Sequence, residues 1–359
     1  MKVHRPLPTA HCPLPLRHFT YAALTLFGLA LTASAQDTDA EKSAAGQITP
    51  AANGAIERGL KWLATQQHDD GGFGAGQARG NVAVCGLAGM AMMSGGSTPG
   101  QGPYGGQVNR CLAYVLANSQ PSGFVTGPDA SHGPMYGHGF ATLFLAECCG
   151  MSSQPDLRGK LSKAVQIIVN SQSKEGGWRY KPVRGDADIS VTVCQMMALR
   201  AARNAGLFVP NETIEHAVDY VKRSQNADGG FMYMSQSSPE SAFPRSAAAV
   251  VALYGAGVYK GPEIEKGLDY LMQFIPAEGV TRREGYYFYG HYYAVQAMWQ
   301  AGGQRWSRWY PAVRDELVDR QRDDGQWVSP NGAEGNECAT AMACMVLQIP
   351  NNYLPIFQR

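Results

Sequence analysis

Apolar residues recur along much of this chain with the period of a helix that is buried on one face. The segment 161–169 shows the pattern most clearly, with apolar side chains at positions i, i+3, i+4, i+7 and i+8: Leu161, Ala164, Val165, Ile168 and Val169. Such a period predicts an amphipathic helix with one face in the core and the other in water. Segments of this kind return from Ala55 onward, so the chain is predicted to be all-α.

Each amphipathic segment is followed by a second segment that is richer in small and apolar residues. These second segments cover residues 81–93, 138–149, 189–202, 246–256, 291–301 and 338–347. A helix that is apolar on most of its faces is buried on most of its faces. We therefore expect these six helices to lie inside the fold and the amphipathic helices to lie outside.

A short motif separates the two kinds of segment. A glutamine is followed by one or two glycines and then by Trp or Phe, as in Gln67 with Gly71-Gly72-Phe73, Gln120 with Gly123-Phe124, Gln172 with Gly176-Gly177-Trp178, Gln225 with Gly229-Gly230-Phe231, and Gln321 with Gly325-Gln326-Trp327. Glycine tolerates the left-handed conformation that ends helices. The motif is therefore expected to stop the outer helix before the inner one begins.

The spacing of the motif predicts the architecture. Successive glutamines are 53, 52, 53 and then 96 residues apart, so a further copy is expected in the last gap. Residues 264–271 match residues 214–221, which places Ile275 where the missing glutamine would stand. Six copies of a unit of about fifty residues predict a solenoid or a closed ring. Two helices per copy make an α/α ring of twelve helices.

The motif also resembles a known repeat. Gln, Gly-Gly and then Trp or Phe at this spacing resemble the repeat of the squalene-cyclase and protein-prenyltransferase superfamily, over almost the whole chain after residue 54. The resemblance implies an α6/α6 toroid, and it implies that Gln67, Trp178, Phe231 and Trp327 tie neighbouring repeats together. That superfamily includes cyclases, lipid transferases and non-enzymatic modules, so the fold does not decide the activity.

The first residues of the chain have the pattern of a targeting segment. Arg17 and His18 precede an apolar run, 21–33, and Ala33-Ser34-Ala35 has the small residues of a cleavage site. The run is shorter than the ~20 apolar residues that span a bilayer. We expect a signal peptide at residues 1–35 with cleavage after Ala35, and hence a secreted or periplasmic protein without a transmembrane segment. Residues 36–54 are expected to be a disordered linker, and residues 55–359 a single toroid domain.

Composition narrows the classes of partner. A net charge of +1 at pH 7 gives no basic field for nucleic acid. Small apolar or sugar-like ligands stay open, and so does a protein partner. Seven cysteines follow residue 35 without zinc-site spacing, and we expect buried free thiols, no metal and no cofactor.

Two histidines occupy equivalent places in the second and fifth repeats. Tyr136-Gly137-His138 and Tyr289-Gly290-His291 are expected to open their inner helices, on opposite walls of the ring. At the mouth of a central cavity, His138 and His291 would serve as acid, base or hydrogen-bond donor to a ligand. The alternative is that each histidine satisfies a backbone group nearby.

The third inner helix is entered through Asp186-Ala187-Asp188-Ile189. This stretch resembles the aspartate-rich motif of class II terpene cyclases, in which the middle aspartate protonates an alkene. The resemblance implies that Asp188 is the proton donor and that Asp186 matches the first aspartate, whereas Ile189 stands in place of the third. Neighbouring carboxylates raise the pKa of a proton donor, and that neighbour is missing. The alternative is that Asp186 or Asp188 caps the helix.

Other polar and aromatic residues near the expected helix starts complete the candidate ligand site: Tyr136, Arg245, Tyr287, Tyr289, Tyr292 and Glu337. A concave site with a few convergent polar groups is the usual ligand site. Aromatic rings stack on a polyene or a sugar ring, and they serve equally as packing.

Three functions stay open on these observations. The first is a squalene-cyclase-like or prenyltransferase-like toroid that binds an apolar or isoprenoid ligand in its cavity, with acid catalysis as an added step. The second is a non-catalytic toroid that binds a ligand or a protein. The third is a polysaccharide lyase or hydrolase, because such enzymes also use α/α toroids.

Overall fold

Twelve α-helices lie in the residues that this computed structural model describes, which are 46–128, 133–277, 285–330, 332 and 334–358. All twelve belong to the unit Asp37–Arg359. The predicted signal peptide and most of the predicted linker fall outside the described residues. None of the described helices is long and apolar enough to cross a membrane.

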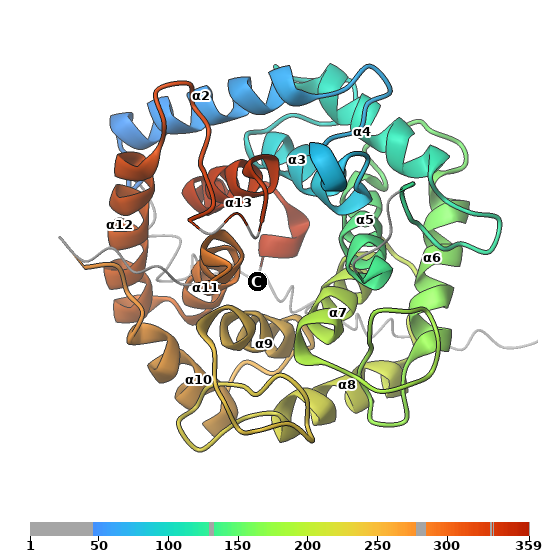
Figure 1. Ribbon diagram of the computed structural model, residues 1–359, viewed down its shortest axis with the longest axis vertical. Helices are drawn as coiled ribbons and strands as arrows, with labels where there is room; N and C mark the ends of the chain where they lie inside the picture. The colour runs from blue at the N-terminus through green and yellow to red at the C-terminus, as the bar shows by residue number, and fades with distance from the viewer. Residues whose placement is uncertain (1–45, 129–132, 278–284, 331, 333, 359) are drawn as a thin grey trace, which may run out of the picture. The chain divides into compact units, whose positions relative to one another are not determined.

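The helices alternate along the chain between an outer and an inner ring (Figure 1). The outer helices are α2 (Pro50–Gln66), α4 (Gly105–Ala117), α6 (Leu157–Ser171), α8 (Asn211–Arg223), α10 (Pro262–Met272) and α12 (Gly303–Arg320). The inner helices are α3 (Val82–Ser94), α5 (Pro134–Cys148), α7 (Ile189–Asn204), α9 (Phe243–Gly255), α11 (Tyr287–Ala301) and α13 (Asn336–Gln348). Each inner helix packs on the next, and α13 packs on α3, which closes the ring. The predicted α6/α6 toroid is confirmed.

Burial follows the pattern read from the sequence. On the outer helix α8 the buried residues form one stripe, which includes Ile214, Ala217 and Val221. On the inner helix α5 every residue from His138 to Cys148 is buried. The repeat expected around Ile275 is present as the pair α10 and α11. One boundary differs, because α2 begins at Pro50, inside the stretch expected to be disordered. Thr49 caps that helix by accepting a hydrogen bond from the Ala52 amide, and Pro50 is well suited to its first position.

The repeated glutamines join adjacent repeats. The side-chain amide of Gln172 donates to the carbonyl oxygens of Gly176, in its own turn (2.7 Å), and of Thr213, on the next outer helix (2.8 Å). Gln67 and Gln225 make the same pair of bonds. Gln321 repeats the pattern with Gly325 and with Ala55 of α2, so the last repeat is joined to the first. The structural role implied for the glutamine is thus confirmed.

Two of the glycines in these turns are required by both conformation and space. Gly176 and Gly325 have φ of +99° and +96°, where residues with a Cβ are strained. A Cβ at Gly176 would lie 2.1 Å from the His216 carbonyl oxygen, and one at Gly325 would lie 2.6 Å from the Arg58 carbonyl oxygen. A residue other than glycine at either position would therefore push the adjacent repeats apart.

Candidate functional site

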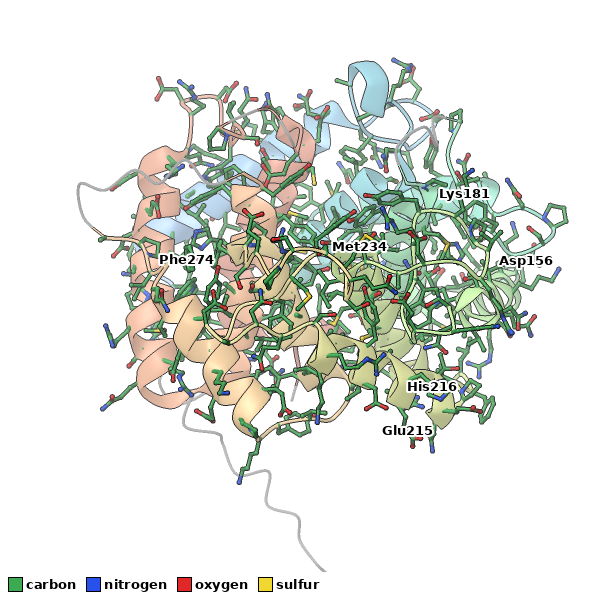
Figure 2. All side chains as sticks on the ribbon, turned by 60° about the horizontal axis from the view of Figure 1, so that its bottom comes forward. Asp156, Lys181, Glu215, His216, Met234 and Phe274 are labelled. Atoms are coloured by element: carbon green, nitrogen blue, oxygen red, sulfur yellow. The ribbon has the colours of Figure 1, made fainter. Side chains whose placement is uncertain are left out.

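The six inner helices begin at the same end of the ring, because each is reached through the turn that follows an outer helix. We call this end the mouth. In Figure 2, Lys181 and Met234 lie toward this end of the molecule, and Glu215 and His216 of α8 lie toward the other end. Tyr136 of α5, Asp188 at the start of α7 and Tyr289 of α11 come together at the mouth, where they influence one another's ionisation. The structure thus brings together three of the residues predicted for the site.

Asp188 is the N-cap of α7. Its Oδ1 accepts a hydrogen bond from the Val191 amide at 2.9 Å, and its side chain is fully buried. Burial raises the pKa of Asp188 to about 6, against the opposing effects of the Val191 amide and of Arg179. Asp188 therefore caps the helix, as in the alternative given for it in the sequence. Asp186 is mostly exposed and forms an ion pair with Arg179 at 2.8 Å.

Arg179 is the cation of the site, and sequence reasoning missed it. Its Nε lies 3.4 Å from Asp188 Oδ2, so one guanidinium contacts both aspartates. The guanidinium carbon lies 4.8 Å from the centre of the Tyr180 ring and 5.7 Å from that of Tyr233. A guanidinium between aromatic faces is held by cation–π attraction as well as by charge. Arg179 is therefore fixed in place at the mouth.

Two further tyrosines were also missed. Tyr180 and Tyr233 share a hydrogen bond between their hydroxyls, and the Tyr233 hydroxyl lies 3.5 Å from Asp188 Oδ2. Their main chains reach back to the preceding repeat, because the Tyr180 carbonyl accepts from the Met135 amide and the Tyr233 carbonyl from the Ile189 amide. These bonds satisfy amides at the starts of α5 and α7. Both tyrosines stand two residues after the aromatic residue of a repeat, which is the signal that would have identified them.

Tyr136 and Tyr289 line the mouth with half-buried rings. The Tyr289 hydroxyl is buried, and Cys194 and Tyr293 lie close enough to it to act as hydrogen-bond partners. Burial is the main cause that raises the pKa of both tyrosines, so both hydroxyls stay protonated. A phenol combines an apolar ring with a polar hydroxyl, which suits a ligand that is largely apolar with one polar atom.

The interior of the ring narrows directly below these tyrosines. Cys194 of α7 and Tyr293 of α11 lie 4.0 Å apart between sulfur and hydroxyl, and both are buried. Their helices are separated in the ring by α9. Cys194 lies six residues below Asp188 on α7, about 9 Å along a helix axis. The two helices are therefore in side-chain contact at this level of the ring.

The two histidines lie below the first turn of their helices and not at the mouth. Helices α5 and α11 begin at Pro134 and Tyr287, so each histidine is the fifth residue of its helix and is buried. His138 Nδ1 accepts from the Val125 amide and Nε2 donates to the Ala164 carbonyl, both at 3.1 Å. Burial lowers the pKa of His138 to about 4. No ring nitrogen of His138 is left for a ligand.

His138 belongs to a structural position that recurs in the repeats. The amide of Trp178 is accepted by Thr192 Oγ1, that of Phe231 by Ser246 Oγ and that of Trp327 by Thr340 Oγ1. The Val125 amide and His138 are the counterparts in the second repeat. His291 is the equivalent residue of the fifth repeat by its place in the helix, and burial lowers its pKa to about 3.

The remaining predicted residues have three different roles: one holds a loop, two are buried in the packing of the ring, and one lies at a helix start. Arg245 holds the loop before α9 by donating to the carbonyl oxygens of Phe231 (2.8 Å) and Glu240. Tyr287 is buried, and the guanidinium carbon of Arg320 lies 4.2 Å from the centre of the Tyr287 ring. Tyr292 is buried deeper in α11, and Glu337 is half-buried in the first turn of α13.

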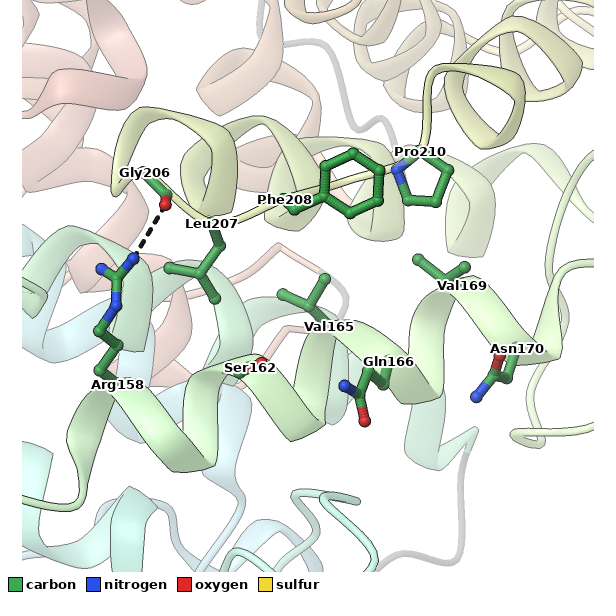
Figure 3. A pocket seen from close by; sticks show the side chains of 10 residues that line it. All are labelled: Arg158, Ser162, Val165, Gln166, Val169, Asn170, Gly206, Leu207, Phe208 and Pro210. Carbon is green, nitrogen blue, oxygen red and sulfur yellow. Dashed lines mark hydrogen bonds between the residues drawn. The ribbon is translucent and has the colours of Figure 1, made fainter.

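A concave site lies outside the ring. A pocket of about 400 Å³ runs between α6 and the segment 206–210, and Figure 3 shows its lining, which includes Arg158, Val165 and Phe208. Arg158 donates to the Gly206 carbonyl at 2.9 Å at one end of it. Among the described residues no group of His, Cys, Asp or Glu side chains is arranged to hold a metal ion.

Two family models match successive parts of the chain. Residues 17–140 match the prenyltransferase alpha-alpha toroid domain, and residues 141–286 match the squalene-hopene cyclase C-terminal domain. No curated protein matches the chain by sequence.

Solved structures with the same fold carry different activities. The type II terpene cyclase MstE from Scytonema aligns with a TM-score of 0.59 at 14% identity, over 85% of this chain and 100% of its own. A cellobiose 2-epimerase from Bacillus thermoamylovorans B4167 aligns with a TM-score of 0.62 at 11% identity, over 83% and 98%. An α-1,6-mannanase from Salegentibacter sp. HEL1_6 aligns with a TM-score of 0.60 at 9% identity, over 84% and 99%.

These alignments establish the fold alone, since the identities are low. The two family models, the repeated glutamine turns and the closed double ring agree with one another. The chain is a member of the squalene-cyclase and prenyltransferase superfamily of α/α toroids.

Proposed function

We propose that this protein is a toroid that binds an apolar molecule of the isoprenoid class at the mouth of its inner ring. The observation that carries the proposal is the pair Tyr136 and Tyr289, whose rings are half-buried near the starts of two inner helices. The phenol groups of these two tyrosines would offer apolar ring faces together with a hydroxyl for the ligand's polar atom.

The site would take one end of a ligand rather than a fully enclosed long chain. Cys194 and Tyr293 meet below the mouth, so a bound ligand would end above them. Tyr180, Tyr233 and Arg179 hold the rim in place through their mutual contacts. A rigid aromatic rim loses little conformational entropy when a ligand binds.

Proton transfer by Asp188 is the second candidate function, favoured by its pKa of about 6. At neutral pH part of the population would carry a proton on this carboxyl group. Asp188 is however fully buried, and its Oδ2 is already in contact with Arg179 and with the Tyr233 hydroxyl. Turnover would therefore require a substrate to reach a carboxyl group that is closed to solvent, whereas binding at the tyrosines does not.

We further propose that the protein acts outside the cytoplasm, on the signal-peptide pattern that ends at Ala35. Sequencing the N-terminus of the protein from its own cells tests this directly. A mature chain that begins at Gln36 supports export, and an intact N-terminus in the cytoplasmic fraction argues against it.

Native mass spectrometry of the full protein, purified from the cells that produce it, tests the binding proposal. We expect a co-purifying isoprenoid in the wild type and in Tyr259→Ala, an exposed tyrosine on the α9–α10 loop, and its loss in the Tyr136→Ala, Tyr289→Ala double variant. Asp188→Asn, which keeps a capping oxygen, should retain the ligand. An Asp188→Asn variant that accumulates an acyclic precursor in place of a cyclic product would establish the catalytic reading instead.

A further inference from the structure

The last residues of the chain cross the end of the inner ring opposite the mouth. After α13 the chain passes through η2 (Ile349–Asn351) to η3 (Pro355–Phe357), and in Figure 1 this red end of the chain lies within the inner ring. We call residues 354–358 the tail. The side chains of Leu354, Ile356 and Phe357 are buried.

Polar side chains from three inner helices bond to the main chain of the tail. Glu147 Oε2 of α5 accepts from the Ile356 amide at 3.3 Å. Gln300 Nε2 of α11 donates to the Phe357 carbonyl at 3.3 Å, and Arg200 of α7 donates to the Gln358 carbonyl at 2.6 Å. Three consecutive residues of the tail are thus held through their main chain.

The apolar side chains of the tail provide the second half of the contact. The Phe357 ring lies 6.5 Å from the Tyr292 ring, edge to face, and η3 packs on α7. Main-chain bonds give affinity to any extended segment, and pockets for particular side chains give selectivity. The ring end therefore recognises the tail in the way that peptide-binding domains recognise a peptide.

The link between the tail and α13 is irregular and partly exposed. Asn352 has a left-handed backbone with φ of +53°, and Tyr353 is 58% exposed. The tail itself has only one short turn of 3-10 helix. A segment of this kind can leave its site without unfolding the helices around it.

We propose that the far end of the inner ring is a binding site for an extended apolar peptide, occupied in cis by the tail. The ligand class follows from the contacts. The peptide needs two adjacent apolar side chains, as in Ile356-Phe357. The amide of the first residue, the carbonyl of the second and the carbonyl of the residue after it must be available to bond to the ring. The site does not involve the tyrosines of the mouth. Its test is therefore independent of the proposed function.

A labelled synthetic peptide with the sequence of residues 352–358 tests the proposal on the full-length protein. In Phe357→Asp the tail should leave its site, because an unpaired carboxylate would otherwise be buried. We expect this variant to bind the peptide at least about tenfold more tightly than the wild type does, since the wild-type site is filled. Adding Glu147→Ala to Phe357→Asp should weaken that binding, and a peptide with Asp in place of the phenylalanine should not bind.

The matched control is Tyr353→Ala, which alters an exposed residue beside the tail and should bind no more peptide than the wild type. A folded Phe357→Asp protein, with unchanged helical circular dichroism, that binds no more peptide than the wild type overturns the proposal.

Hydrogen exchange of the wild-type protein decides the matter if Phe357→Asp does not fold. The Ile356 amide should exchange at least about 100-fold faster than the amides in the middle of α5 and α7, because the tail opens while the ring stays closed. An Ile356 amide that exchanges only as fast as those of α5 shows that the tail is an inseparable part of the core, and contradicts the proposal.

Discussion

The Cys194 thiol and the Tyr293 hydroxyl lie 4.0 Å apart across the interior of the ring, although α7 and α11 are not neighbours. The contact links two inner helices below the tyrosines of the mouth. We expect it to limit how far a bound ligand can extend into the ring.

Tyr293→Ala should deepen the site at a cost in stability. Removing a buried aromatic side chain costs about 3–5 kcal/mol. The space released lies directly below Tyr289, so we expect tighter binding of long isoprenoid alcohols relative to short ones. Calorimetric unfolding together with binding of an alcohol series of increasing chain length measures both effects. Equal affinity across the series, in both proteins, would show that this contact does not limit the site.

The bond from Gln321 to Ala55 joins residues that are far apart in the sequence, and it closes the ring. Gln321→Ala should lower the free energy of unfolding by about 1–3 kcal/mol, because two carbonyl oxygens lose their donor. The matched control is Gln120→Ala. Gln120 is exposed, and at its junction Lys160 of the next outer helix, α6, donates to the Leu116 carbonyl of α4.

Urea unfolding of the two glutamine variants makes the comparison. We expect the control to stay within about 0.5 kcal/mol of the wild type. Similar losses in both variants would mean that the glutamine bonds do not stabilise the closed ring.

Much of the fold could be predicted because the glutamine turns repeat. Gln172, Gly176 and Trp178 recur at a fixed period, and each makes local bonds that any copy of the turn must make. The copy around Ile275 was predictable from its neighbours even though its glutamine is absent.

The site was harder to predict because its contacts cross between repeats. His138 looked like a mouth residue, but its helix begins a turn earlier and its ring faces the Ala164 carbonyl of an outer helix. Arg179 and Tyr233 gain their importance only from meeting Asp188, which lies in another part of the chain. Nothing in the periodicity indicated that the tail would return to the ring.

Glu147 makes stability depend on pH near neutrality. Burial raises its pKa from the ordinary value of 4.5 to about 7. Between pH 4.5 and pH 7, the folded protein therefore keeps a proton on Glu147 that the unfolded chain has released. The free energy of unfolding falls as the pH rises through this range, and above about pH 7 this group changes it no further. The loss attributable to this group is up to about 3 kcal/mol.

Glu147→Gln should remove this slope while keeping an acceptor for the Ile356 amide. Thermal unfolding of both proteins between pH 4 and pH 8 tests the expectation, with Glu212→Gln on the exposed face of α8 as the control. His138 and His291 act in the opposite direction, since their lowered pKa values cost stability as pH falls below about 6.5. The difference in thermal stability between the variant and the wild type at each pH isolates the effect of Glu147. Stability curves that run parallel over the whole pH range would contradict the assignment.

The central claim is that the tyrosines of the mouth bind an apolar ligand. A fluorescent polyene fatty acid, displaced by farnesol, measures this directly on the full-length protein. We predict saturable binding at one site that weakens at least about tenfold in the Tyr136→Ala, Tyr289→Ala double variant, because two aromatic walls are lost. Tyr259→Ala, at the other end of the ring, should bind as the wild type does. Equal binding by the double variant, or no saturable binding by the wild type, would contradict the claim.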